Sequence, residues 1–500
     1  MGLKVKKTEI EVEREIGYKY LQMLSRAEAL VPGAGREAIE ALLWDANAII
    51  IRADVQSDRV VLDGTLNCQA VYRQGEETSL RALSAKSTIS QVTEIPGAQG
   101  GMLSRVQPVV ENVEARYENG HMVFLVSLGI HVRVMKLEPV EVIEALEDAE
   151  ELETRFQEVC LTRLAAEASE TSVLTGRVEL PQALDARAAL MDWGSVNVES
   201  AEPDLGGVRV KGRAQIETLI ASGLEGRPAV LVKYPIEFDK LIELPEWLSQ
   251  TACVTPSIRS VRTQLEQGGE EEESTLAIQA DVHFAIVANL RECVNILQDA
   301  YATGGNGVET RMEQLTACRD AHCLRATESV RGTVLLEEGA SSVSSVIAVR
   351  VLPNIAEIQP TDKGCRISGL MEATVLYMTG GSDVPASTHT QLPFDLELPW
   401  ELGENPVINL NIASAEANAL MSDRLEMKVG LNIDCEARMQ QSVDYVAEVE
   451  EGEPLQRRSG YIICWPEAGE DAWTVGKRYA IPAASIEGKI AKGQPLVLRK

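Results

Sequence analysis

The chain has 500 residues and a formal net charge of −29, from 76 acidic and 47 basic residues. We expect several domains, because single hydrophobic cores stop growing well before this length. A surface of this charge repels phosphate backbones, so the composition disfavours nucleic acid as a partner. Apolar residues make up an ordinary 45% but aromatic residues only 4%, so cores of Val, Ile, Leu and Ala are expected.

The opening segment of the chain and its cysteines indicate in which cellular compartment it is expected to work. The opening MGLKVKKTEIEVEREIGYKY has no apolar stretch of the kind found in secretion signals, and no later run is long enough to span a membrane. Nine scattered cysteines do not indicate a disulfide framework, so most are expected to be buried thiols. Cys318, His322 and Cys323 lack the spacing of a zinc site, and we expect no metal. The chain is therefore expected to be soluble and unsecreted.

One pattern recurs three times along the chain. Its first element is an alternating apolar stretch around a glycine, which predicts a strand pair closed at Gly64, Gly212 and Gly369. An acidic and apolar stretch reaches a proline roughly 30 residues later, at Pro96, Pro245 and Pro399. Because the glycines lie roughly 150 residues apart, the repeat is the size of a whole domain.

The later elements of the pattern are also strands. Strongly alternating runs begin at His121, Ser274 and Asp423, and edge-like runs follow at Val140, Val294 and Val443. Many short alternating strands separated by turn residues predict three tandem antiparallel β-sandwich or barrel-like modules. We place them at residues 1–167, with an N-terminal extension, 168–322 and 323–456. Residues 36–46 and 148–168 also fit helices, but strands are preferred.

No catalytic constellation can be assembled from the sequence. The five histidines fall at positions that do not match between the copies. The glycine clusters at 303–307 and 379–382 lack the Lys-Ser/Thr of a phosphate-binding loop, and residues 337–346 lack the second glycine of a nucleophile elbow. We therefore expect a protein that is not an enzyme, with no catalytic residue and no cofactor.

The last 42 residues, 459–500, differ from the repeats. A strand at 461–466 precedes a short helix around Trp473, and GQPLVLRK predicts a closing strand. The order of Gly469, Glu470, Asp471, Ala472, Trp473, Val475, Gly476, Arg478 and Tyr479 resembles a LysM module. The resemblance implies a small α+β module with a glycan groove. Its usual second helix is compressed here to ASIEGKIAK.

The resemblance yields a candidate binding site in this terminal segment. It comprises Gly469, Glu470, Asp471, Trp473, Lys477, Arg478, Tyr479, Ile481 and Pro482. An alternative is that Trp473, Val475 and Tyr479 form the core of the module. Because the second helix is altered, the module is expected to bind a protein instead of peptidoglycan.

Three such modules followed by one LysM-like module resemble the SPOCS-domain spore-coat proteins of endospore-forming clostridia. The resemblance implies a scaffold or adaptor for coat assembly that works in the mother-cell cytoplasm, at the forespore surface and spore coat. It implies that the LysM-like end binds the coat morphogenetic ATPase and that the chain recruits other coat proteins. A peptidoglycan-binding protein of the cell wall or spore cortex is the alternative, and homo-oligomerisation stays open.

Overall fold

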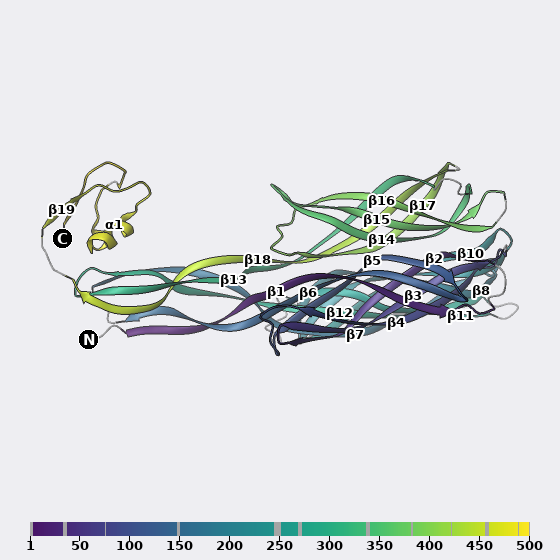
Figure 1. Ribbon diagram of the computed structural model, residues 1–500, viewed down its shortest axis with the longest axis horizontal. Helices are drawn as coiled ribbons and strands as arrows, with labels where there is room; N and C mark the ends of the chain where they lie inside the picture. The colour runs from purple at the N-terminus through teal and green to yellow at the C-terminus, as the bar shows by residue number, and fades with distance from the viewer. Residues whose placement is uncertain are drawn as a thin grey trace.

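The computed structural model describes residues 4–33, 38–75, 77–147, 151–244, 252–268, 273–336, 341–381, 384–421, 423–455, 460–488 and 490–499. These residues form a mainly β protein with an elongated shape (Figure 1). A wide body of strands continues into a narrow stalk, and a small module containing the one α-helix of the described residues lies beside the end of the stalk. The expectation of a mainly β chain is confirmed.

The body and stalk consist of three units with the same topology. Each unit has two three-stranded antiparallel sheets, and in each the sixth strand is the centre of one sheet and the third strand the centre of the other. The first unit contains β1 (Lys4–Leu30), β2 (Ile39–Gln56), β3 (Arg59–Gln74), β4 (Arg81–Glu94), β5 (Leu103–Glu118) and β6 (His121–Glu147). The second contains β7 (Leu152–Leu180), β8 (Ala186–Asp204), β9 (Gly207–Leu224), β10 (Arg227–Glu243), β11 (Ala252–Glu266) and β12 (Ser274–Ala302). The third contains β13 (Asn306–Leu335), β14 (Val343–Thr361), β15 (Gly364–Thr379), β16 (Pro385–Leu398), β17 (Val407–Met421) and β18 (Arg424–Pro454).

The borders between the units lie where long strands begin. Residues 167 and 168 lie inside β7, which pairs with β12 from Leu152 to Leu180, and residues 322 and 323 lie inside β13, which pairs with β18. The N-terminal segment is strand β1, which pairs with β6 along its length. Residues 39–46 and 152–168 are strands, as preferred.

The three repeated glycines lie in the middle of single strands. This corrects the prediction that each closes a strand pair: Gly64, Gly212 and Gly369 lie within β3, β9 and β15. Each faces a β-bulge in the neighbouring edge strand, at Ile50/Arg52, Val198/Ser200 and Ile355/Glu357. A Cβ at any of the three would collide with a carbonyl oxygen of that strand. The glycine is needed because a bulge pushes the edge backbone against it.

The stalk is built from the ends of six strands. The runs at Val140, Val294 and Val443 are not separate edge strands as predicted, because they continue β6, β12 and β18. Each forms a ribbon with the first strand of its unit, and the three ribbons share one core (Figure 1). Equivalent side chains face that core from all three ribbons, namely Val140 and Val142, Val294 and Ile296, and Val443 and Tyr445.

Each unit also has its own apolar core between its two sheets. The units join in a further cluster that takes equivalent positions from each. Seven residues after each repeated glycine stand Val71, Leu219 and Leu376, and 21 residues before it stand Leu43, Met191 and Ala348. Contacts among equivalent positions place the three units around one pseudo-threefold axis.

The cysteines divide into two groups. Cys68, Cys318, Cys365, Cys435 and Cys464 are buried thiols, as expected for most of the nine. Two disulfides were not expected: Cys160–Cys293 within the second unit and Cys253–Cys323 between the second and third units. Pro245 and residues 269–272 of the acidic loop lie outside the described residues.

Truncating the shared core of the stalk tests this arrangement. Ile296 is 0% exposed and belongs to the core cluster to which all three ribbons contribute, so we expect Ile296→Ala to lower the free energy of unfolding by about 2–5 kcal/mol. The exposed neighbour Asn295 provides the control, because Asn295→Ala should change it by less than about 0.5 kcal/mol. Urea unfolding followed by circular dichroism measures both. Equal effects of the two substitutions would contradict a shared core.

Candidate functional site

The terminal module contains β19 (Tyr461–Cys464), α1 (Ala472–Tyr479), the 3₁₀ turns of Ala483–Ser485, and β20 (Leu496–Arg499). Helix α1 begins where the Asp471 carboxylate accepts the Thr474 backbone N–H at 2.9 Å, which caps the helix. It ends at Ala480, which adopts the left-handed conformation with φ 52°. The two strands pair antiparallel and cover a small core of Cys464, Val475, Ile481, Leu496 and Leu498. The predicted order of strand, helix and closing strand is present.

One face of helix α1 rests on the tip of the second unit's ribbon. Asp299 of β12 accepts a hydrogen bond from the Trp473 indole N–H at 2.9 Å and pairs with the Lys477 ammonium at 2.5 Å. Tyr301 donates its hydroxyl to the Ile481 carbonyl at 3.0 Å and stacks edge to face on Trp473, with ring centroids 4.9 Å apart. A Cβ at Gly476 would collide with the Tyr301 hydroxyl. The module is therefore seated on the stalk by a specific polar and aromatic contact.

We call this contact of Asp299 and Tyr301 with the module the seat, and it depends on residues that the other two ribbons lack. Asp299 and Tyr301 stand three and five residues after the core residue Ile296. The equivalent positions carry Ala145 and Glu147 in the first ribbon and Glu448 and Glu450 in the third. Neither pair combines a carboxylate with an aromatic ring, so neither can accept the indole N–H while stacking on the indole.

The predicted site residues fall into separate environments. Trp473 and Lys477 contact the stalk, Ile481 lies in the core with Tyr479 packed against it, and Glu470 pairs with Arg478. Asp471 caps α1 and lies 3.6 Å from Arg155 of β7. Gly469 adopts φ 90° in the preceding turn, and Pro482 is exposed. The structure thus brings Trp473 and Lys477 together with the stalk instead of on a free surface.

The opposite side of the module is apolar and exposed. Tyr461 and Ile463 of β19, Trp465 just after this strand, and Val497 of β20 are exposed by 75%, 57%, 60% and 59%, respectively. Ile463 and Val497 face each other across the ladder. We call these four residues the apolar face. Clustered exposed apolar side chains of this size mark interaction surfaces in soluble proteins.

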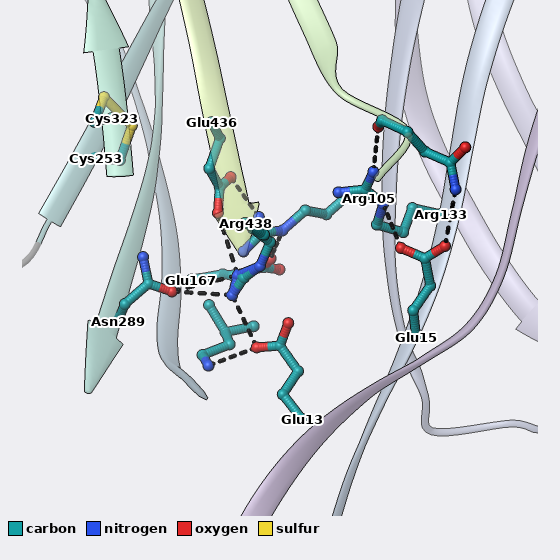
Figure 2. Close-up of polar contacts among 12 residues, drawn as sticks. Glu13, Glu15, Arg105, Arg133, Glu167, Cys253, Asn289, Cys323, Glu436 and Arg438 are labelled. Atoms are coloured by element: carbon teal, nitrogen blue, oxygen red, sulfur yellow. Dashed lines mark hydrogen bonds and ion pairs between the residues drawn. A yellow bond between two sulfur atoms is a disulfide. The ribbon is translucent and has the colours of Figure 1, made fainter. Parts of the chain in front are cut away.

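A buried polar cluster joins strands of all three units (Figure 2). Arg438 of β18 and Glu13 of β1 are each about 5% exposed at the side chain and form an ion pair of 2.9 Å. Arg438 also donates to Asn289 of β12 at 3.1 Å, and the backbone N–H of Leu164 in β7 donates to Glu13 at 2.7 Å. We call this cluster the junction, because it connects strands from all three units.

A second arginine extends the junction. Arg105 of β5 pairs with Glu167 of β7 at 2.9 Å and with Glu436 of β18 (Figure 2). Burial by itself raises the pKa of Glu436, but the guanidinium groups of Arg105 and Arg438 outweigh it and hold this pKa below its usual value. Glu436 is therefore a half-buried carboxylate whose charged form is favoured by two arginines from different units.

A cavity of about 2050 Å³ extends along the borders between the units, beside the junction. Edge strands of all three units line it, and side chains of one unit satisfy the edge of the next. Asn47 donates to the Ile258 carbonyl at 3.2 Å, Asn354 donates to the Glu111 carbonyl at 2.7 Å, and Arg350 pairs with Asp45 at 2.7 Å. The two asparagines thus occupy backbone carbonyls of edge strands, groups through which an exposed edge could pair with another chain.

The described residues show no group of three or more His, Cys, Asp or Glu side chains that could hold a metal ion. Within the same residues, none of the helices is long and apolar enough to cross a membrane. The apolar face provides a binding surface at one end of the molecule. The junction provides a network of charges that fixes the three units to one another.

The sequence analysis missed the junction and the apolar face. In β18, Glu436 and Arg438 stand at the polar positions of an alternating pattern that Cys435, Ala437 and Met439 continue, so the pattern gives no signal that the two charged residues form a cluster. Their partners lie in distant parts of the chain, so the pattern alone does not identify them. The segment 461–466 was predicted only as a strand, and periodicity does not tell which side of a two-stranded sheet is covered.

Comparison with known families decides part of the identity. Residues 38–118 match the family described as SipL, SPOCS domain. The match implies a sporulation-related protein. It covers β2 to β5 of the first unit, and β8 to β11 and β14 to β17 repeat this arrangement in the other two. Neither the curated proteins nor the solved structures contain a match to the chain.

The seat of the terminal module can be tested by removing its central acceptor. In Asp299→Ala, the Trp473 indole N–H and the Lys477 ammonium lose their acceptor on the stalk, so we expect the module to move relative to the stalk. Spin labels at Asn295 and Arg499, both exposed, should give a narrow distance distribution in the parent chain and a broad one in the variant. Gln298→Ala is the control, because Gln298 bonds to Gln157 of its own unit. A distribution that stays narrow in Asp299→Ala would refute the seat.

The junction predicts a pH dependence of stability. A carboxylate whose folded pKa is depressed stabilises the folded state above its unfolded pKa, and this contribution is lost as the pH falls through the folded pKa. Between pH 7 and about pH 3.5, the parent chain should therefore lose more unfolding free energy than Glu436→Gln does. Glu426→Gln, at an exposed position of the same strand, should lose as much as the parent. Urea titrations at each pH give the comparison, and parallel curves for the parent and Glu436→Gln would speak against a depressed pKa.

Proposed function

We propose that the chain is a non-enzymatic scaffold or adaptor of spore coat assembly. Its three units are all SPOCS modules, and its terminal module is LysM-like and docks to the coat morphogenetic ATPase at the forespore surface, in the mother-cell cytoplasm. The observation that carries this proposal is the apolar face, which lies on the terminal module beside the tip of a long stalk (Figure 1).

The geometry favours docking through the sheet side of the module. Trp473 and Lys477 are held by Asp299, so the side of α1 that carries them is occupied within the chain. The apolar face is turned to solvent, and no described side chain of the body covers it. Burying exposed aromatic and aliphatic side chains of this kind provides most of the free energy of many protein interfaces.

The body supports a scaffold through its stiffness. Three units joined by the junction and by shared cores present their outer sheets in fixed relative positions. Several binding surfaces on one rigid chain raise the effective concentration of their partners, so that no single contact has to be tight. Other coat proteins are the partners that we propose for these outer sheets.

Substitution of the apolar face tests the docking step. The double variant Ile463→Thr and Val497→Thr keeps β-branched residues in the ladder and removes apolar surface. We expect it to bind the purified coat ATPase at least tenfold more weakly, about 1.4 kcal/mol, in titration calorimetry with the full chain. Leu205→Thr, which alters an apolar residue 81% exposed in the second unit, should bind like the parent.

Two outcomes would contradict the proposal. Unchanged binding by the double variant would show that the apolar face is not the docking surface. Co-sedimentation of the full chain with purified peptidoglycan, together with no binding to the ATPase, would favour the alternative of a peptidoglycan-binding protein.

A further inference from the structure

One of the two disulfides lies within a unit, and the other connects two units. Cys160 and Cys293 are register partners in the β7–β12 ladder, so their strands remain paired whether or not the sulfurs are bonded. Cys253 lies in β11 of the second unit and Cys323 in β13 of the third. These two strands belong to different sheets. The Cys253–Cys323 bond is therefore a covalent tie between two units, across 70 residues of sequence.

The two cysteines of this tie differ in exposure. Cys253 is buried, with 6% of its surface exposed, whereas Cys323 is an exposed residue. Both residues line the cavity between the units. A thiolate can attack a disulfide only at a sulfur that it can reach. The exposed side of this bond is thus Cys323.

The tie lies against the junction. Cys323 is the register partner of Glu436, the carboxylate that pairs with Arg105 and Arg438 (Figure 2). Two residues along β13, Arg325 donates to the Val254 carbonyl, next to Cys253.

We propose that Cys253–Cys323 is a thiol-exchange site that opens and closes the tie between the second and third units. The thiolate of an incoming thiol attacks Sγ of Cys323, a new S–S bond forms to that sulfur, and Cys253 leaves as a thiolate that takes up a proton. One disulfide and one thiol are consumed and one of each is formed, so the step needs no other oxidant or reductant. The ligand class is a thiol, from a small molecule or from a protein cysteine.

Opening the tie has a mechanical consequence. The junction and the shared cores still hold the three units together, but β11 loses its covalent link to β13. We therefore expect local opening of β11 to become easier, while the β7–β12 ladder keeps its protection. The inference does not depend on the coat function proposed above.

The site of attack can be mapped on the full chain. Oxidised protein is incubated with reduced glutathione, quenched with acid, alkylated and analysed by peptide mass spectrometry. We expect glutathione on Cys323 and the alkyl group on Cys253, in a ratio of at least about ten over the reverse. A protein carrying one exposed cysteine serves as the second probe: an adduct with glutathione alone identifies a small thiol as the ligand, and adducts with both admit a protein thiol. Similar labelling of both cysteines, or labelling only after denaturation, would overturn the assignment.

Two matched variants give an independent reading. Cys253→Ser leaves the exposed Cys323 as a thiol, and Cys323→Ser leaves the buried Cys253. An aromatic disulfide reagent should react with the first at least about tenfold faster than with the second. Circular dichroism establishes that both are folded. Equal rates in folded variants would contradict selective access.

Hydrogen exchange tests the mechanical consequence. After reaction with glutathione, backbone amides of β11 should exchange faster than in the oxidised parent, and those of β12 paired with β7 should not change. Unchanged exchange in β11 would show that the bond does not restrain the two units.

Discussion

The structure depends on one constraint, the alternation of inward-facing apolar side chains along six strands of 27 to 31 residues. Where these strands leave the body, they form ribbons of two strands each. A two-stranded ribbon is at best marginally stable in water. The apolar rows of the three ribbons can be buried only against each other, and this brings the three units around one axis. The stalk, the junction and the seat of the terminal module all follow from that packing.

Apolar packing alone does not fix how the units are rotated about the axis. At the position seven residues before Val142, Ile296 and Tyr445, the three units carry Met135, Asn289 and Arg438. The single arginine bonds to the asparagine of the second unit and to Glu13 of the first. A buried charge without its partner costs several kcal/mol, so any other arrangement of the units is strongly disfavoured. The identical topology of the units thus coexists with one specific order around the axis.

Sequence reasoning went as far as local pattern allows. Alternation identified strands, and recurring glycines identified the threefold repeat, because both signals lie within a few residues. It did not show that Gly64 faces a bulge, since the bulge belongs to another strand. Nor did it predict the Cys253–Cys323 bond or the Arg438–Glu13 pair, whose members lie in different units. In the terminal module, the helix around Trp473 was predicted, but its seat on Asp299 depends on where the stalk ends.

A double-mutant cycle between Arg438→Met and Glu13→Gln tests most directly that the units share one axis. The two residues are 425 positions apart in sequence, so any coupling between them reports contact of the first and third units. The account predicts a coupling free energy of about 1 to 3 kcal/mol in urea unfolding. Additive effects, within about 0.5 kcal/mol, would contradict it and would mean that the units fold as independent domains on a string.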